Sequence, residues 1–293
     1  NEMPDQTTDQ GVIIARNLTA YCHDEDPTRP TSLGCNKRDA VFRDIVNQVD
    51  IFGLNYFHKT YPVFKEQNPT RRYHASETSS ATSSRGEYFF PVTTDVNDSR
   101  SGFQLSSYDM TTIGWGCAPE VQFKMNEEYP FMSGEFVWTG FDYLGEPTPY
   151  YSDWPSHSSL FGIIDLAGIP KDRYYLYRSH WNKDVETLHI LPHWNWEGRE
   201  GEVTPVFVYT NYPTAELFIN GKSQGKRTKD LSVTVHNSGD SLSTANFKRQ
   251  KRYRLMWMDT KYEPGTVKVI AYDKDGNAVA EKEMKTAGKP YRI

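Results

Sequence analysis

Acidic side chains that directly follow predicted strands are the residues of this sequence best placed for catalysis. Glu77 follows the predicted strand 73–76 and precedes three hydroxyl side chains at 78–80, which could donate hydrogen bonds to its carboxylate. Such bonds favour the ionised form of a carboxyl group. A carboxylate of this kind, paired with a second carboxyl group about 5–5.5 Å away, can hydrolyse a glycosidic bond with retention. On position alone, a solvent-exposed acid at a strand end remains the simpler interpretation of Glu77.

Strands and helices alternate over the part of the chain that contains Glu77. Apolar patterning predicts strands at 28–35, 49–56, 73–76 and 131–138 and helices near 9–22, 41–46, 61–64, 118–128 and 171–181. This alternation indicates a parallel sheet with right-handed crossovers. We count four strand–helix units, whereas a closed (β/α)₈ barrel needs eight units and about 250 residues. The sequence therefore predicts the C-terminal half of a (β/α)₈ catalytic barrel over residues 1–183.

The pattern changes in the remaining part of the chain. Short β-branched and aromatic segments occupy residues 203–209, 215–219, 253–258 and 266–272. Asn220-Gly221 lies between two of these segments, which is a strong signal for a β-hairpin. We therefore expect an immunoglobulin-like β-sandwich domain over residues 184–293. The expected fold class is α/β plus all-β.

Composition excludes several classes of partner. The net charge is −5 and the basic residues are dispersed, so no nucleic-acid-binding stripe is visible. No run of 18 apolar residues is present, so we expect no membrane span. Three cysteines at positions 22, 35 and 117 lack the spacing of a zinc site or a disulfide framework, and we expect buried free thiols. We predict no metal and no cofactor.

Five segments of the chain resemble, in the correct order, the catalytic barrel of glycoside hydrolase family 2 β-galactosidases. They are residues 1–6 (NEMPDQ), 26–30 (DPTRP), 52–56 (FGLNY), 74–86 (HASETSS to SSRG) and 134–143 (GEFVWTGFDY). The resemblance places them at strands four to eight of that family's barrel, with residues 74–86 as the nucleophile segment. Asn-Glu alone would carry no information, but five ordered matches do.

The resemblance implies a role for each of five residues. Glu77 would be the catalytic nucleophile and Glu2 the general acid/base. Asn1 would hydrogen-bond the sugar 2-hydroxyl, an interaction that strengthens in the transition state. Tyr56 would orient the nucleophile, and Trp138 would line the floor of the subsite that holds the cleaved sugar. Tyr56 and Trp138 could instead be buried core aromatics.

One further acid and the missing part of the barrel complete these expectations. Asp142 follows the last predicted barrel strand and could bind sugar hydroxyls, or it could anchor a loop. The chain opens at Asn1 without an initiator methionine, so we expect it to come from a longer protein. The N-terminal barrel half and the sandwich domains that precede it in this family are missing. We therefore expect this chain to be inactive by itself.

Three hypotheses about the function stay open. The first is an exo-acting, retaining β-galactosidase acting on an oligosaccharide or glycoside, or, within the same family, a β-glucuronidase or β-mannosidase. Glucuronidases of this family resemble one another in an Asn-x-Lys element, and neither Asn36-Lys37 nor Asn182-Lys183 has its spacing, which favours galactose. The second is a non-catalytic, carbohydrate-binding or structural fragment, and the third an unrelated (β/α)₈ hydrolase. The resemblance implies a periplasmic or secreted location.

Overall fold

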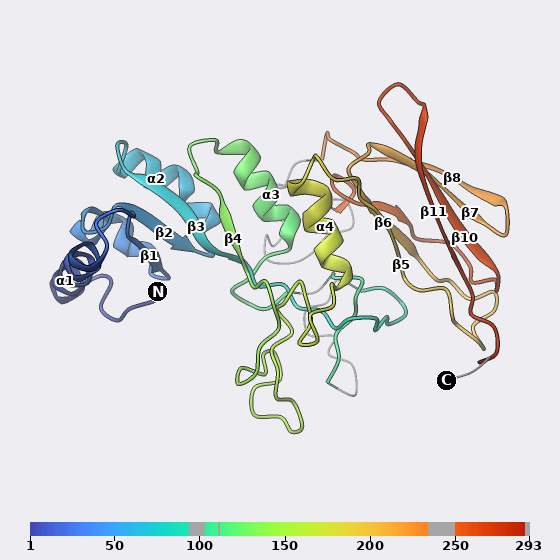
Figure 1. Ribbon diagram of the computed structural model, residues 1–293, viewed down its shortest axis with the longest axis horizontal. Helices are drawn as coiled ribbons and strands as arrows, with labels where there is room; N and C mark the ends of the chain where they lie inside the picture. Colours follow the sequence, from blue (N-terminus) through green and yellow to red (C-terminus); the bar gives the residue numbers. More distant parts are fainter. Residues whose placement is uncertain (94–102, 111, 234–249, 291–293) are drawn as a thin grey trace. The chain divides into compact units, whose positions relative to one another are not determined.

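The computed structural model describes residues 1–93, 103–110, 112–233 and 250–290. They divide into two compact units. The first contains residues 1–80 and 115–139, and the second contains residues 81–114 and 140–293. Figure 1 shows the helices and strands of each unit along the chain.

The first unit is a mixed α/β structure. Its elements are α1 (Asp9–Glu25), β1 (Ser32–Cys35), the 3₁₀ helices η1 (Arg38–Phe42) and η2 (Asp44–Asn47), β2 (Ile51–Asn55), η3 (His58–Thr60), α2 (Tyr61–Gln67), β3 (Arg72–Ser79), α3 (Pro119–Glu128) and β4 (Glu135–Trp138). The four strands form one sheet in the order β1-β2-β3-β4, and every neighbouring pair is parallel. The predicted parallel sheet is therefore confirmed.

One face of this sheet carries the packed core of the unit. Leu33, Phe52 and Tyr73 are neighbours in register on β1, β2 and β3, and all three are buried. Phe64 of α2 packs on the two aromatic residues, with its ring centroid 5.4 Å from that of Phe52 and 4.2 Å from that of Tyr73. Burial of these large side chains is the main force that holds α2 against the sheet.

The opposite face of the sheet is far less covered. Gly34, Gly53 and His74 are neighbours in register there. The His74 ring meets the edge of Phe136, whose side chain is 64% exposed. An exposed phenylalanine on a parallel sheet is unusual, because such sheets are normally covered on both faces.

Two predictions of secondary structure in this unit were wrong. The apolar residues between 41 and 46 form the two short 3₁₀ helices η1 and η2 rather than one α-helix, because Arg43 between them is extended at φ −111° and ψ 157°. Val41, Ile45 and Val46 are buried all the same. Glu77 lies inside β3 rather than after it, since the strand continues to Ser79.

The second unit contains two antiparallel sheets. After α4 (Asp172–Trp181) its strands are β5 (Leu188–Leu191), β6 (Val206–Thr210), β7 (Thr214–Ile219), β8 (Lys222–Thr228), β9 (Leu255–Trp257), β10 (Thr266–Tyr272) and β11 (Ala278–Lys285). One sheet has the order β11-β10-β7-β8 and the other β5-β6-β9. Val208 and Trp257 of one sheet share a single buried core with Leu217 and Val269 of the other.

The predicted hairpin turn is present in this unit. Asn220 and Gly221 join β7 to β8 with φ values of 48° and 78°. Two positive φ angles in succession are the signature of the tight turn that asparagine and glycine favour. The two compact units do not divide between residues 183 and 184, because the segments 81–114 and 140–183 group with the two sheets. A domain boundary at 183 and 184 stays a prediction.

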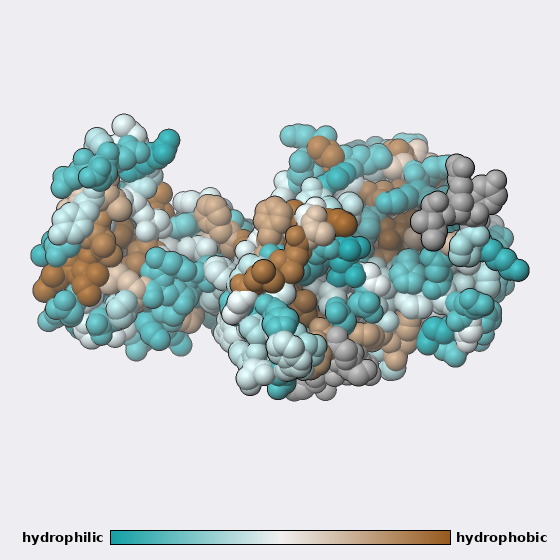
Figure 2. Space-filling model, turned by 60° about the horizontal axis from the view of Figure 1, so that its bottom comes forward, coloured by the Kyte–Doolittle hydropathy of each residue, from teal (hydrophilic) through white to brown (hydrophobic). Residues whose placement is uncertain are grey.

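Three further findings concern surface and cysteines. All three cysteines are free, but Cys22 is exposed, so its predicted burial was wrong, whereas Cys35 and Cys117 are buried. Among the described residues, every helix is too short or too polar to cross a bilayer. On the face shown in Figure 2, hydrophobic residues gather in patches between hydrophilic ones.

Candidate active site

The carboxyl ends of β2 and β3 bring Tyr56 and Glu77 together. Asn55, the last residue of β2, is the register partner of Glu77, and the next backbone N–H, that of Tyr56, donates to the Glu77 carbonyl across 2.9 Å. Tyr56 has a φ of 62°. This left-handed conformation is uncommon for a bulky residue and marks a constrained position.

The Glu77 carboxylate accepts a hydrogen bond on each oxygen. The Tyr56 hydroxyl donates to Oε2 across 2.7 Å, and the Asn1 amide nitrogen donates to Oε1 across 2.6 Å. Glu77 is 7% exposed. The hydroxyl of Thr78, one of the donors expected from the sequence, instead donates to Glu135. The side chains that hold Glu77 thus come from distant parts of the chain.

Tyr56 is a permanent donor to this carboxylate. Burial, followed by the hydrogen bond to Glu77, raises the pKa of the Tyr56 phenol far above its usual value. A phenol deprotonated next to a carboxylate would place two negative charges together with little water. Tyr56 therefore keeps its proton throughout the pH range in which an enzyme works.

Asn1 and Glu2 contact residues at the carboxyl ends of β1 and β2, and the N label in Figure 1 marks this end of the chain. A Cβ built at Gly34 would lie 2.1 Å from the Asn1 amide oxygen, so a larger residue at position 34 would displace the Asn1 side chain from this place. Glu2 is held at both oxygens. Asn55 donates to Oε1 and Asn36 donates to Oε2, each across 2.8 Å. Asn36 and Asn55 were missed in the sequence analysis.

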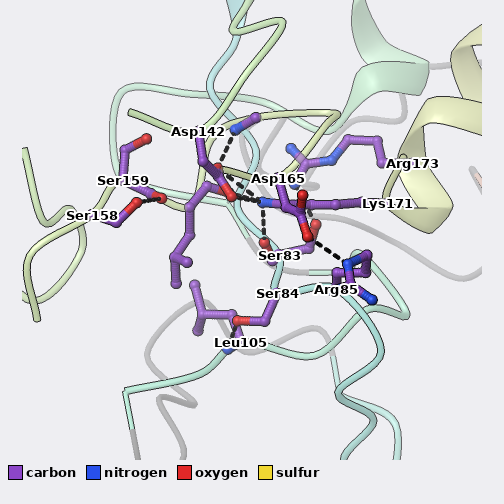
Figure 3. A network of polar contacts seen from close by, with 12 residues as sticks. Ser83, Ser84, Arg85, Leu105, Asp142, Ser158, Ser159, Asp165, Lys171 and Arg173 are labelled. Atoms are coloured by element: carbon purple, nitrogen blue, oxygen red, sulfur yellow. Dashed lines mark hydrogen bonds and ion pairs between the residues drawn. The ribbon is translucent and has the colours of Figure 1, made fainter. Parts of the chain in front are cut away.

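Trp138 and Asp142 complete the set of predicted residues. Trp138 ends β4 in register with Ser79, two residues beyond Glu77, and is half-buried. Asp142 belongs to the second unit and is 8% exposed. Its carboxylate lies 2.7 Å from the Lys171 ammonium and accepts the Gly162 N–H (Figure 3). The structure thus groups Asn1, Glu2, Tyr56 and Glu77, and gives Asp142 a separate partner.

Lys171 is a buried cation that ties several segments of the second unit together. It donates to the carbonyl of Ser83 across 2.6 Å as well as to Asp142, as Figure 3 shows. Burial lowers the pKa of Lys171 to about 8 and raises the pKa of Asp142, each partly offset by the other's charge. Next to this pair, Arg173 and Asp109 form a second buried ion pair at 3.1 Å.

The chemistry available at the edge of the sheet is that of two carboxylates. Glu77 lies on β3, and Glu2, in the segment that precedes α1, is bound to Asn55 at the end of the neighbouring strand β2. Neutral amide and phenol groups donate to both carboxylates. Within the described ranges, His, Cys, Asp and Glu side chains form no group that could hold a metal ion. Two carboxylates at the carboxyl ends of parallel strands are typical of enzymes that cleave glycosidic bonds.

Comparison with known proteins agrees with this class. The chain is 41% identical to a β-galactosidase of Bacteroides ovatus named BoGH2A, over 96% of this chain and 31% of that protein. It is 27% identical to a putative β-glucuronidase of Formosa agariphila, over 96% of this chain and 27% of that one. The chain thus spans less than a third of the length of these curated relatives.

Solved structures give the same result. A β-glycosidase from Bacteroides vulgatus aligns with 99% of this chain and 36% of its own, with 29% identity and a TM-score of 0.72. A family 2 glycosyl hydrolase from Bacteroides cellulosilyticus aligns with 99% of this chain and 34% of its own, with 25% identity and a TM-score of 0.70. The chain belongs to glycoside hydrolase family 2. Residues 201–280 also match a family model described as "Domain of unknown function (DUF4982)".

Proposed function

We propose that this chain carries the catalytic carboxylates of a retaining, exo-acting β-glycosidase, with Glu77 as nucleophile and Glu2 as general acid/base. The observation that carries this proposal is that Glu2 is bound to Asn55, the last residue of β2 and the register partner of Glu77 on β3. Tyr56 and Asn1 donate hydrogen bonds to Glu77, and Glu2 follows Asn1 directly in the chain. A retaining mechanism needs two carboxyl groups about 5–5.5 Å apart.

The proposed reaction is a double displacement. In the first step a Glu77 oxygen bonds to the anomeric carbon while the bond from that carbon to the leaving oxygen breaks, and Glu2 gives its proton to that oxygen. In the second step Glu2 takes a proton from water, whose oxygen bonds to the anomeric carbon as the bond to Glu77 breaks. After the first step Glu77 is bonded to the sugar and Glu2 is ionised. After the second step Glu77 is ionised again and Glu2 carries a proton.

The surrounding residues serve this cycle by position. The Tyr56 hydroxyl fixes the direction in which the Glu77 carboxylate points, because it holds one oxygen and leaves the other to attack. Asn1, which donates to that other oxygen here, would pass its hydrogen bond to the sugar 2-hydroxyl when substrate enters. Trp138 would form the floor of the subsite. Asp142, already bound to Lys171, fits a loop anchor better than a sugar ligand.

Galactose is the proposed sugar. A β-galactosidase is the relative with 41% identity over nearly the whole chain, whereas the relatives named as β-glucuronidases are 27–32% identical. The sequence does contain two Asn-x-Lys elements with the glucuronidase spacing, which the sequence analysis overlooked. Asn246-Phe247-Lys248 lies outside the described residues. The other element is Asn220-Gly221-Lys222. It forms the β7–β8 turn, where the Asn220 side chain binds Thr266 and Pro264. This element therefore serves a turn.

The proposed enzyme is longer than this chain. Within the described residues, β1 and β4 each pair on one side only, and the sheet face with Phe136 is open. Unpaired strand edges and exposed apolar side chains invite a partner. We propose that the first unit is half of a (β/α)₈ barrel that the N-terminal part of the enzyme completes, and that the second unit contains an immunoglobulin-like domain.

A chromogenic β-galactoside tests the proposal. The full-length enzyme should cleave it faster than the matching β-glucuronide and β-mannoside, and Glu77→Gln should lose at least a thousandfold in kcat, by analogy with loss of other catalytic nucleophiles. Glu66→Gln, an exposed acid on α2, is the matched control and should leave kcat unchanged. Full activity in Glu77→Gln would exclude the assignment. Turnover by the 293-residue chain alone would contradict the need for an N-terminal barrel half.

A further inference from the structure

The carboxylate of Glu2 is fixed in space by two amides. Asn36 lies just after β1 and binds one oxygen, while Asn55 ends β2 and binds the other, each at 2.8 Å. Glu2 itself is exposed, so no packing restrains its side chain. The two amides alone set the plane of the carboxylate, because they hold both of its oxygens.

The amide of Asn55 is in turn oriented by the neighbouring strand. The hydroxyl of Ser76 on β3 donates to the Asn55 amide oxygen. An amide oxygen only accepts and an amide nitrogen only donates. With its oxygen engaged by Ser76, Asn55 presents its nitrogen to Glu2. Asn55 is fully buried, so rotation of its side chain would leave polar atoms without partners.

A glycine makes room for this contact. A Cβ built at Gly53 would lie 2.5 Å from the Ser76 hydroxyl oxygen and 2.4 Å from the Leu33 carbonyl oxygen. Any larger residue at position 53 would push the Ser76 side chain out of its place. Asn55 of β2 and Ser76 of β3 thus form a chain of contacts that ends at Glu2, and Asn36, just after β1, binds Glu2 directly.

We propose that Ser76, Asn55 and Asn36 are positioning residues for the acid/base Glu2. This inference rests on the proposed function of Glu2. A general acid contributes only when its proton points at the leaving oxygen, and the same carboxylate must then deprotonate water from the same place. Neutral amides fix the direction of the carboxylate without placing a charge next to it.

The proposal predicts a defect that depends on the leaving group. A dinitrophenyl β-galactoside departs without protonation, whereas an alkyl β-galactoside needs the acid. Ser76→Ala and Asn36→Ala should therefore lose about 10- to 100-fold in kcat/KM on the alkyl substrate, a part of the usual contribution of a general acid, and less than about threefold on the dinitrophenyl substrate. A general loss of structure would lower both rates alike.

The matched control is Ser32→Ala. Ser32 lies on β1, on the same side of the sheet as the site, and its hydroxyl contacts His74 rather than the Glu2 network. Both substrates should keep their rates in this variant. Melting temperatures of all variants are measured in parallel, and Asn36→Ala keeps the test decisive if Ser76→Ala folds poorly, since Asn36 is only half-buried.

Glu2→Gln tests the acid/base role of Glu2 separately from the positioning role of the residues around it. If Glu2→Gln shows the leaving-group-dependent loss and both positioning variants show none, the positioning role is wrong and the acid/base assignment stands. If Glu2→Gln lowers kcat/KM equally on both substrates or on neither, the acid/base assignment fails and the positioning role fails with it. The proposal holds if all three variants share the same selective loss in the full-length enzyme.

Discussion

The Tyr56 hydroxyl lies 2.7 Å from Glu77 Oε2 and donates its proton to that oxygen. Tyr56→Phe removes the donor but keeps the ring. A hydrogen bond to a charged group contributes about 1.5–3 kcal/mol, so kcat should fall roughly 10- to 100-fold. The fall should be equal for good and poor leaving groups, because Glu77 rather than Glu2 is affected.

The control for this change is Tyr21→Phe, which removes a hydroxyl from a side chain that is 65% exposed on α1. Its kcat should match that of the unmodified enzyme. Steady-state kinetics with two β-galactosides measure both variants. Unchanged kcat in Tyr56→Phe would show that the hydroxyl does not serve the nucleophile.

The contact between Gly34 and Asn1 gives a second prediction. In Gly34→Ala the new methyl group would meet the Asn1 amide oxygen at 2.1 Å, so the Asn1 side chain has to leave its place. The kcat/KM of Gly34→Ala should therefore resemble that of Asn1→Ala, and the double variant should be no worse than either. Gly114→Ala, where the methyl group meets open space, is the control. Fully additive losses would show that Gly34 acts independently of Asn1.

The buried pair of Lys171 and Asp142 should stabilise the second unit. Lys171→Met leaves the Asp142 carboxylate buried without its cation, and breaking a buried pair in this way costs about 3–5 kcal/mol. Combining Lys171→Met with Asp142→Asn should recover part of that loss. Urea unfolding, followed by a signal from the second unit, gives both free energies. Equal destabilisation in the single and double variants would mean that the charges are not coupled.

The same lysine should make stability depend on pH. Burial lowers the folded-state pKa of Lys171 to about 8, whereas an unfolded lysine titrates near pH 10.4. Between these values the unfolded chain binds more protons than the folded one, so the contribution of Lys171 to stability rises with pH. The difference in unfolding free energy between the unmodified protein and Lys171→Met should therefore grow from pH 8 to pH 10. A difference that shrinks over this window would contradict the lowered pKa.

The cysteines should differ in reactivity. Cys22 is exposed on α1. Cys35 is buried, and burial raises the pKa of its thiol to about 11, so little reactive thiolate forms near neutral pH. Iodoacetamide should label Cys22 first in the native protein and should reach Cys35 and Cys117 only after unfolding. Peptide mapping measures this order, and rapid native labelling of Cys35 would contradict its burial.

Much of the fold could be predicted because periodic apolar residues mark it. The helices around Val12 and Leu176 and the buried strands around Phe52 and Val208 follow directly from that pattern. Strands β8 and β11 escaped it because they are polar and mostly exposed, as in the segment 222–228. Their place in the sheet is set by pairing with β7 and β10, which no local pattern reveals.

The candidate site, like the fold, could be predicted only in part from the sequence. Glu77 and Tyr56 were predicted from residue type and segment order, and the structure brings them together. Tyr56 does donate to Glu77 as expected, but Thr78 does not, since it adjoins Glu77 in sequence while its side chain donates to Glu135. Asn55 did leave a signal. A buried asparagine at the end of an apolar strand needs polar partners, and such partners point to a site.

A mechanism-based 2-fluoro-galactoside with a good leaving group is the most direct test of the central claim, that Glu77 is the nucleophile. The sugar should form a stable bond with the enzyme, and peptide mapping by mass spectrometry should find it on Glu77 in the segment 74–86. Glu77→Gln should take up no label. Attachment to any other residue, or unchanged labelling in Glu77→Gln, would contradict the account.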